Sequence, residues 1–294
     1  MDWPITTLLG ASGLAFVIGI LTGAFGIGGG FVLTPGLMIL FSIPPATAVG
    51  TNLATVLTNS SFGLYKRRGS KTVDGKLALT VSAGTCMGVL AGSYLLDVLE
   101  RMPQAVLLGR QHDPAELVLL LLFALLLLWI ALHITWDTHR TEKQDDNTTR
   151  RLLGRLRIPP TARFSTVGQG PLSIPLLIVL GAMVGILAGL MGIGGIVLLP
   201  ALIYLAGQDA REAAGTSLVL VWFAALIGVM HRGWMGHISV SLWAVMIAGG
   251  LTGTYVGTYI GLKVAGEKLK AGFLGVVLLA LVAVGGRMYG MLFR

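Results

Sequence analysis

Hydrophobic positions run along this chain in about ten stretches, separated by short polar segments. The first set lies at residues 5–24, 31–42, 46–63, 75–97 and 115–136, and the second at 172–190, 196–206, 211–230, 239–262 and 268–291. Most of these stretches have roughly the 20 residues that a helix needs to cross a hydrocarbon core. The pattern predicts an all-α, polytopic transmembrane helical bundle.

Composition supports a membrane setting. Only 12% of the 294 residues are charged and 54% are hydrophobic, whereas soluble domains carry about 25% charged residues. The net charge of +8 comes from Lys and Arg between the hydrophobic stretches, where basic residues mark the cytoplasmic side. We therefore interpret the positive charge as a topology signal and expect no nucleic-acid partner.

The second half of the chain repeats the first. Residues 19–29 align with 185–195, with eight of eleven positions identical. The match continues through Gly50–Asn52 with Gly215–Ser217, Gly63 with Gly228, and Gly84, Gly88 and Gly92 with Gly249 or Gly250, Gly253 and Gly257. Matched positions in register over this length indicate a duplicated unit, as many transporters have.

The repeat predicts the domain organisation. Residues 1–136 form the first transmembrane repeat, 137–171 a basic cytoplasmic linker, and 172–294 the second repeat. Because each repeat holds five segments, an odd number, the second copy enters from the opposite face. Both termini are then expected outside. This topology requires 31–42 and 196–206 to cross the membrane, and both are short enough to be half-helices.

Clustered glycines supply the first candidate site. Adjacent glycines weaken a helix, and freed backbone groups in lipid must be buried in protein or line a wet cavity. The N–H groups of a resumed helix would suit an anion. The candidate substrate-binding glycines are Gly26, Gly28, Gly29 and Gly30 in the first half and Gly192, Gly194 and Gly195 in the second. Close helix packing through small residues is the alternative interpretation.

Polar side chains inside the next hydrophobic stretch supply the second candidate. Thr51 and Asn52 align with Thr216 and Ser217. Hydroxyl and amide donors suit an oxyanion that must bind and leave again, although Ser and Thr also form ordinary interhelical hydrogen bonds in membranes. Asn52 is the most costly of the four to bury without a partner, so it is the strongest candidate.

Other features favour packing or topology over chemistry. The fourfold glycine spacing from Gly84 indicates close helix packing. His231 and Arg232 lie at a helix end, where they could attract anions or anchor the interface, and neither repeat core has an obvious buried carboxylate. We find no metal-ligand cluster and no phosphate-binding loop, so no metal, cofactor or catalytic residue is expected, and an intramembrane enzyme is disfavoured.

The paired motifs resemble those of a known family. Gly23-Ala-Phe-Gly-Ile-Gly-Gly-Gly30, Pro35 and Gly50-Thr51-Asn52, with their second-half counterparts, are similar to the sulfite exporter TauE/SafE family of membrane permeases. The second half departs from the pattern at Ser217, which stands where the first has Asn52, so the halves need not contribute equally.

The resemblance implies a multi-pass permease of the cell (inner) membrane that moves small anions, often sulfite or an organosulfonate. The residues themselves lead only to an inverted-repeat transporter with a glycine site suited to an anion. We expect a secondary transporter that works by alternating access, with a passive anion channel of the same fold as the alternative. A coupling ion, either proton or sodium, and a homo-oligomer remain open as partners.

Overall fold

The expected helices are present in the computed structural model, which describes residues 3–25, 30–66, 73–107, 110–139, 158–164, 172–193, 197–198, 201–206, 208, 210–263 and 266–293. The first half contains α1 (Ile5–Phe25), α2 (Gly30–Phe41), α3 (Pro45–Lys66), α4 (Gly75–Arg101) and α5 (Pro114–His139). The second contains α7 (Ile174–Met191), the π-helical η1 (Ala201–Ala206), α9 (Ala210–Trp234), α10 (Val240–Lys263) and α11 (Gly266–Phe293). Seven of these are long and apolar enough to cross a membrane, which confirms the transmembrane helical bundle.

The small amount of strand lies outside the long helices. Two antiparallel ribbons pair β1 (Ala105–Leu107) with β2 (Arg110–His112) and β3 (Thr161–Ala162) with β4 (Leu172–Ser173). The hydropathy pattern did not predict them, because each strand is only two or three residues long. They leave the all-α class of the bundle unchanged.

The two short segments of the sequence pattern remain short. Helix α2 has 12 residues, which span about 18 Å at 1.5 Å per residue, well below a ~30 Å hydrocarbon core. In the matching segment the described residues are 197–198 and the six residues of η1. The described parts of both segments are thus shorter than a span, and the glycine-rich residues 26–29 and 194–196 lie outside the described residues.

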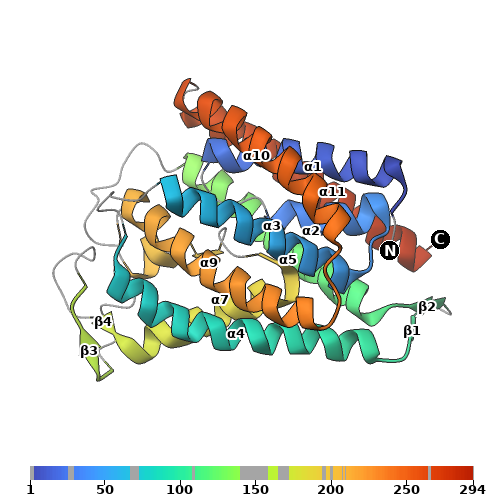
Figure 1. Cartoon of the computed structure of the whole chain (residues 1–294). Coiled ribbons are helices and arrows are strands. Elements are labelled where there is room, and N and C mark those ends of the chain that lie inside the picture. The colour runs from blue at the N-terminus through green and yellow to red at the C-terminus, as the bar shows by residue number, and fades with distance from the viewer. Residues whose placement is uncertain are drawn as a thin grey trace.

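Helices of one half pack along helices of the other. In Figure 1, α1 runs beside α10, and α4 beside α7. A Cβ atom on Gly84, Gly88 or Gly92 of α4 would overlap the backbone of α7 at Ile178, Ala182 or Ile186. At matched positions, Gly249, Gly253 and Gly257 of α10 meet the backbone of α1 at Ser12, Phe16 and Ile20. The glycine ladder is thus a packing surface, as its spacing predicted.

Helices α3 and α9 contact each other reciprocally. Gly63 of α3 meets the side chain of Leu218, and its counterpart Gly228 of α9 meets the side chain of Leu53, the counterpart of Leu218. When two equivalent elements are related by a twofold axis, each contact between them occurs twice with the two partners exchanged. The halves therefore pack alike at these positions, while their inverted placement in a bilayer stays a prediction.

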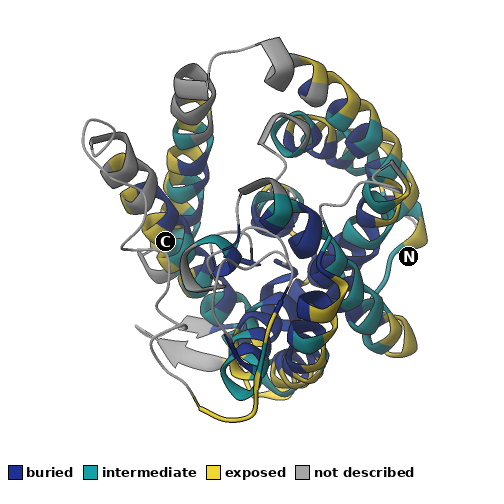
Figure 2. Ribbon diagram, turned by 90° about the vertical axis from the view of Figure 1, so that its left-hand side faces the viewer, coloured by how far each residue is buried: buried dark blue, intermediate teal, exposed yellow. Residues whose placement is uncertain are grey.

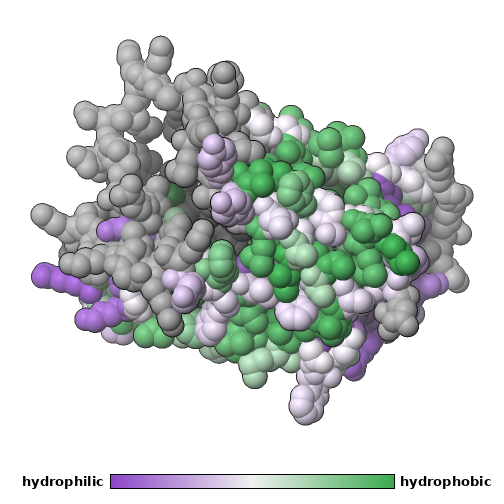
Figure 3. Space-filling model, turned by 45° about the horizontal axis from the view of Figure 1, so that its top comes forward, coloured by the Kyte–Doolittle hydropathy of each residue, from purple (hydrophilic) through white to green (hydrophobic). Residues whose placement is uncertain are grey.

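Burial and hydropathy follow the bundle. Viewed along the helices in Figure 2, buried residues face inward and exposed residues face outward. The outward side chains include large apolar ones such as Leu9, Leu79, Leu279 and Val282, each more than 60% exposed. Figure 3 shows this hydrophobic surface across the middle of one face, with hydrophilic side chains toward the two ends. A band of this kind is what a lipid-facing surface requires.

One end of the bundle gathers both termini, the end of α4 and the turn between α9 and α10 (Figure 1). The two termini were predicted to share one side, and this arrangement agrees with that prediction. Which side of a membrane this end faces remains the expectation drawn from the basic loops.

The glycine contacts make a stability prediction. Gly88→Ala should destabilise the protein by about 1–3 kcal/mol, since the added methyl group would press on the Ala182 carbonyl and force α4 and α7 apart. Gly285→Ala in α11 is the matched control, because a Cβ there meets nothing within 4 Å. The midpoint of thermal unfolding in detergent measures both. Equal midpoints for the two variants would contradict the close approach of the helices.

Candidate functional site

Asn52 lies where the broken segments of both halves meet. Its side chain is fully buried in α3. The two hydrogens of the amide nitrogen Nδ2 are shared among three acceptors: the carbonyl oxygen of Gly30 at 2.9 Å, the carbonyl oxygen of Gly192 at 3.1 Å and Oγ1 of Thr34 at 2.8 Å. One side chain therefore ties the start of α2 to the end of α7.

The backbone at this point is shaped by glycine. Gly192 ends α7 in the left-handed region at φ 73°, a conformation that side chains rarely adopt. A Cβ on Gly192 would approach Nδ2 of Asn52 at 3.0 Å, and one on Gly30 would approach the Gly192 carbonyl at 2.9 Å. The absence of side chains on both glycines is what lets the two broken ends and Asn52 come together.

The two threonines make matched contacts at the helix interfaces. Thr51 Oγ1 accepts from the backbone N–H of Ser239, just before α10, at 3.1 Å. Thr216 Oγ1 accepts from the backbone N–H of Asp74, just before α4, at 3.4 Å, and from Nε2 of Gln208 at 3.3 Å. Both threonines are fully buried. Each therefore fastens its helix to the start of the matching helix in the other half.

The structure brings together only part of the predicted site. Gly30, Asn52 and Gly192 lie in direct contact, and Thr51 adjoins Asn52 in α3. Ser217 is buried and bonds the carbonyl of Ala214 within its own helix. Five predicted glycines lie outside the described residues: Gly26, Gly28, Gly29, Gly194 and Gly195.

A buried group of charges lies near the end of the bundle that holds the termini. Arg232 of α9 is fully buried, and its Nη1 donates to Oδ1 of Asp97 in α4, while Nη2 donates to the Ser93 carbonyl at 3.0 Å. The second carboxylate oxygen of Asp97 lies 2.8 Å from Nε2 of His231. Burying an arginine is costly unless its charge is paired, and Asp97 supplies that pairing.

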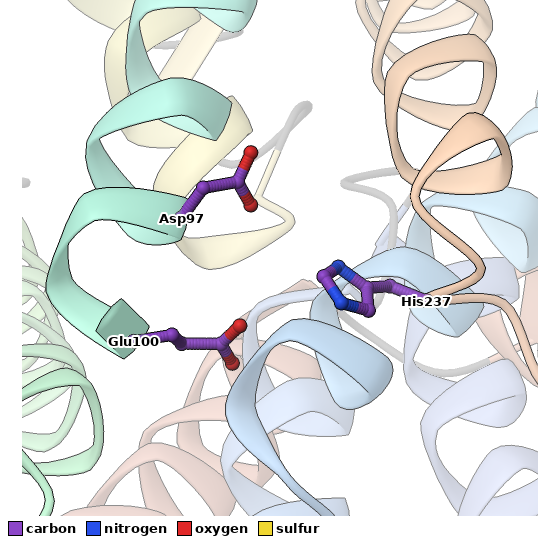
Figure 4. A group of neighbouring side chains, drawn as sticks. All are labelled: Asp97, Glu100 and His237. Carbon is purple, nitrogen blue, oxygen red and sulfur yellow. The ribbon is translucent and has the colours of Figure 1, made fainter.

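Two further side chains complete this group. In Figure 4 the side chains of Asp97 and Glu100 extend from α4 toward the ring of His237, and one ligand-type atom from each of the three lies within 4.8 Å of the others. Oε1 of Glu100 accepts from the backbone N–H of Ala46 at 2.8 Å, at the start of α3. We call this group the α4–α9 charge cluster; its members are Asp97, Glu100, His231, Arg232 and His237.

Sequence reasoning missed this cluster. It placed Asp97, His231 and Arg232 near segment ends and found no obvious buried carboxylate, yet Asp97 is 6% exposed and Arg232 0%. The available signal was the presence of one acidic and one basic residue inside otherwise apolar stretches. Their pairing depends on α4 crossing α9, which neither stretch reveals alone. Arg232 is thus a buried ion-pair partner, and the expectation of an interfacial anchor was wrong.

Comparison with known proteins gives the family. The sequence profile described as "Sulfite exporter TauE/SafE" matches residues 11–284. The chain belongs to this family. No solved structure matches the chain significantly.

Curated relatives of this TauE/SafE chain include the "Probable membrane transporter protein YjnA" of Bacillus subtilis, 23% identical over 268 residues that cover 91% of this chain and 95% of the relative. A protein of the same description from Methanocaldococcus jannaschii is 22% identical, covering 87% of each chain. Bacillus subtilis YunE is 38% identical over 82 residues, which cover 28% of this chain and 30% of YunE. The family is thus one of probable membrane transporters, and this chain is a multi-pass membrane protein.

Removing the hydrogen bonds of Asn52 should lower the free energy of unfolding. Asn52→Leu should lower stability by about 1–3 kcal/mol, because the Gly192 carbonyl at the end of α7 would lose its donor. Thr58→Val is the control, since its hydroxyl only bonds Ala54 within the same helix. Unfolding midpoints in detergent compare the two. A leucine variant as stable as the valine variant would mean that Asn52 does not hold the broken ends.

The buried ion pair predicts a larger loss. Asp97→Asn should destabilise the protein by about 3–5 kcal/mol, because it removes the charged carboxylate that is hydrogen-bonded to a buried guanidinium. Glu116→Gln is the matched control: Glu116 pairs with Arg287 at 2.9 Å, and that arginine is 36% exposed, so about 1 kcal/mol or less is expected. Chemical or thermal unfolding compares the two variants. Similar losses would show that Arg232 is less buried than described.

Proposed function

We propose that this chain is a secondary transporter of the cell membrane that moves a small anion, with a sulfur oxyanion or an organosulfonate as the substrate class. The support for sulfur is the family description alone. The support for an anion is the glycine-rich sequence before Gly30, together with the buried contacts of Asn52 with Gly30 and Gly192.

The chemistry at this point favours negative charge. A helix that begins inside the protein presents backbone N–H groups without intrahelical partners and carries a partial positive charge. Both amide hydrogens of Asn52 already serve protein oxygens. We therefore propose that Asn52 positions the broken helix, and that the backbone N–H groups of the glycine segments contact the substrate. Thr51, Thr216 and Ser217 would border this cradle.

Alternating access is the mechanism we propose for movement. The candidate site lies between the halves, and Asn52 contacts both broken segments at once. Rocking of one group of helices against another around such a site would expose it to each side in turn, as in other repeat-based transporters. The interlocked pairs α1–α10 and α4–α7 would then move as rigid units, because their backbones are too close to slide freely.

A passive anion channel of the same fold is the competing function. It differs in kinetics, since a channel does not need the whole protein to change conformation for each ion. Uptake of labelled substrate into proteoliposomes that saturates, and that is accelerated by unlabelled substrate inside, identifies a transporter. Unsaturated flux with measurable single-channel currents identifies a channel.

Binding is tested by thermal stabilisation of the purified protein. The panel is sulfite, thiosulfate, sulfoacetate, methanesulfonate and taurine, with sulfate, phosphate, acetate and chloride as comparators. A ligand at about 100 times its dissociation constant should stabilise the protein by roughly 2.7 kcal/mol. We expect a selective response to a sulfur anion. A response to a carboxylate alone would remove the sulfur assignment.

Gly30→Ala locates the site. The added methyl group would press on the Gly192 carbonyl and shift the start of α2, so we expect affinity to fall at least about tenfold, equivalent to ~1.4 kcal/mol. Gly13→Ala in α1 is the control, because a Cβ there meets nothing within 4 Å. Unchanged affinity in a folded Gly30→Ala protein would move the site away from the broken helices.

A further inference from the structure

We infer that His231 is the proton-binding residue that couples anion movement to a proton gradient, acting within the α4–α9 charge cluster. The inference rests on the proposed function, because coupling requires an anion to be moved. It names the coupling ion and the residue that carries it.

Charge balance in the cluster calls for one more positive charge. Asp97 and Glu100 each carry a negative charge, and Arg232 carries one positive charge, so the cluster is negative by one while both histidines are neutral. Net charge is costly to hold at low dielectric. One proton on a histidine neutralises the cluster, and histidine is the side chain that ordinarily changes charge between about pH 5 and 8.

The contacts distinguish the two histidines. Nε2 of His231 lies 2.8 Å from a carboxylate oxygen of Asp97, which can only accept, so Nε2 carries a hydrogen. A proton taken from water then adds to Nδ1 of His231 and is later released, and no other bond forms or breaks. Nδ1 of His237 instead lies 3.5 Å from Nη1 of Arg232, which can only donate, so this nitrogen of His237 is an acceptor.

Exposure places His231 at the edge of the buried pair. Its side chain is 20% exposed, against 7% for Asp97 and 0% for Arg232. Asp97 from α4 contacts it directly, and Arg232 from its own helix, Glu100 from α4 and His237 from the α9–α10 turn gather around that carboxylate. From α3 the cluster receives the backbone N–H of Ala46. A proton on His231 would therefore lie beside a negative charge and at the most exposed point of the ion pair.

The cluster adjoins the candidate anion site through the α9–α10 turn. A Cβ on Gly50 would overlap the carbonyl of His237 and would lie 3.2 Å from Cβ of Arg232. The next residue, Thr51, accepts a hydrogen bond from Ser239 of the same turn, and the one after it is Asn52. A change in the cluster thus acts directly on the segment of α3 that holds the broken helices.

This proximity predicts the sign of coupling. A proton on His231 removes the excess negative charge near the anion site, so anion binding becomes more favourable. By linkage, a bound anion favours the proton to the same extent. The anion and the proton therefore travel together, as symport.

The cluster takes Asp97 and Glu100 from the first half and its other members from the second, and the sequence repeat does not supply a second copy of it. The positions that match Asp97, His231 and Arg232 are Leu262, Lys66 and Arg67. Neither the carboxylate nor the imidazole has a counterpart at the matched position, so the inferred proton site belongs to the end of the bundle that holds the termini. A divalent metal would have to share this space with the guanidinium of Arg232, whose like charge disfavours it.

The experiment uses purified protein in proteoliposomes with labelled methanesulfonate and sulfoacetate. Both are anions of strong sulfonic acids, so they do not leak across lipid as neutral acids, and protein-free liposomes set the background. Exchange without a gradient is measured first, and then uptake driven by an inward proton gradient. One pH unit should accumulate a monovalent anion about tenfold if one proton moves with it.

Three variants separate the outcomes. His231→Gln and His231→Lys fix the charge of the side chain, so exchange should remain measurable while gradient-driven accumulation falls to background. His237→Gln should still accumulate the anion. If both His231 variants accumulate like the wild type, or if the wild type exchanges anions without responding to the gradient, the inference is wrong and the proposed function stands. Absence of exchange for both sulfonates in the wild type would overturn both.

Discussion

The structure depends on satisfying backbone groups where helices are interrupted inside an apolar bundle. Gly192 ends α7 inside the bundle, and the last turn of a helix leaves carbonyl oxygens without intrahelical donors. Each such group that stays unsatisfied at membrane depth costs several kcal/mol. The amide of Asn52 supplies a donor to the Gly192 carbonyl and also contacts the carbonyl of Gly30 in α2. A membrane protein can keep broken helices at its centre only if such a donor is present, and here one residue serves both halves.

The same requirement explains how the rest of the bundle is arranged. Lipid offers no hydrophobic drive for helices to associate, so close packing and polar contacts must hold them. Glycines along α4 and α10 let α7 and α1 approach to backbone contact, and Thr51 and Thr216 fasten α3 and α9 to the starts of the partner helices. Because each of these contacts joins a helix of one half to a helix of the other, the tightly packed units of the bundle are mixed pairs of helices and not the two halves.

Much of this could be predicted from the sequence because it depends on periodic or matched positions. Hydrophobic stretches gave the helices to within a few residues, apart from η1, whose described part begins five residues after the predicted start at 196. Fourfold glycine spacing predicted close packing, since it places glycines on one helix face. Asn52 stood out because an unpaired amide is costly in lipid, although its partners were not predictable: they are carbonyls of residues 22 and 140 positions away.

The charge cluster shows where sequence reasoning stops. Asp97 and Arg232 lie 135 positions apart, and each is an isolated charge near the end of an apolar stretch. A charge near the end of an apolar stretch is more often solvated at the membrane interface than buried. Taken alone, each residue was therefore reasonably interpreted as an interfacial charge. Only the crossing of α4 and α9 turns two interfacial charges into a buried pair with a histidine at its edge. That crossing is itself one of the contacts between helices of different halves, so the packing around Asn52 and the charges beside it share one structural cause.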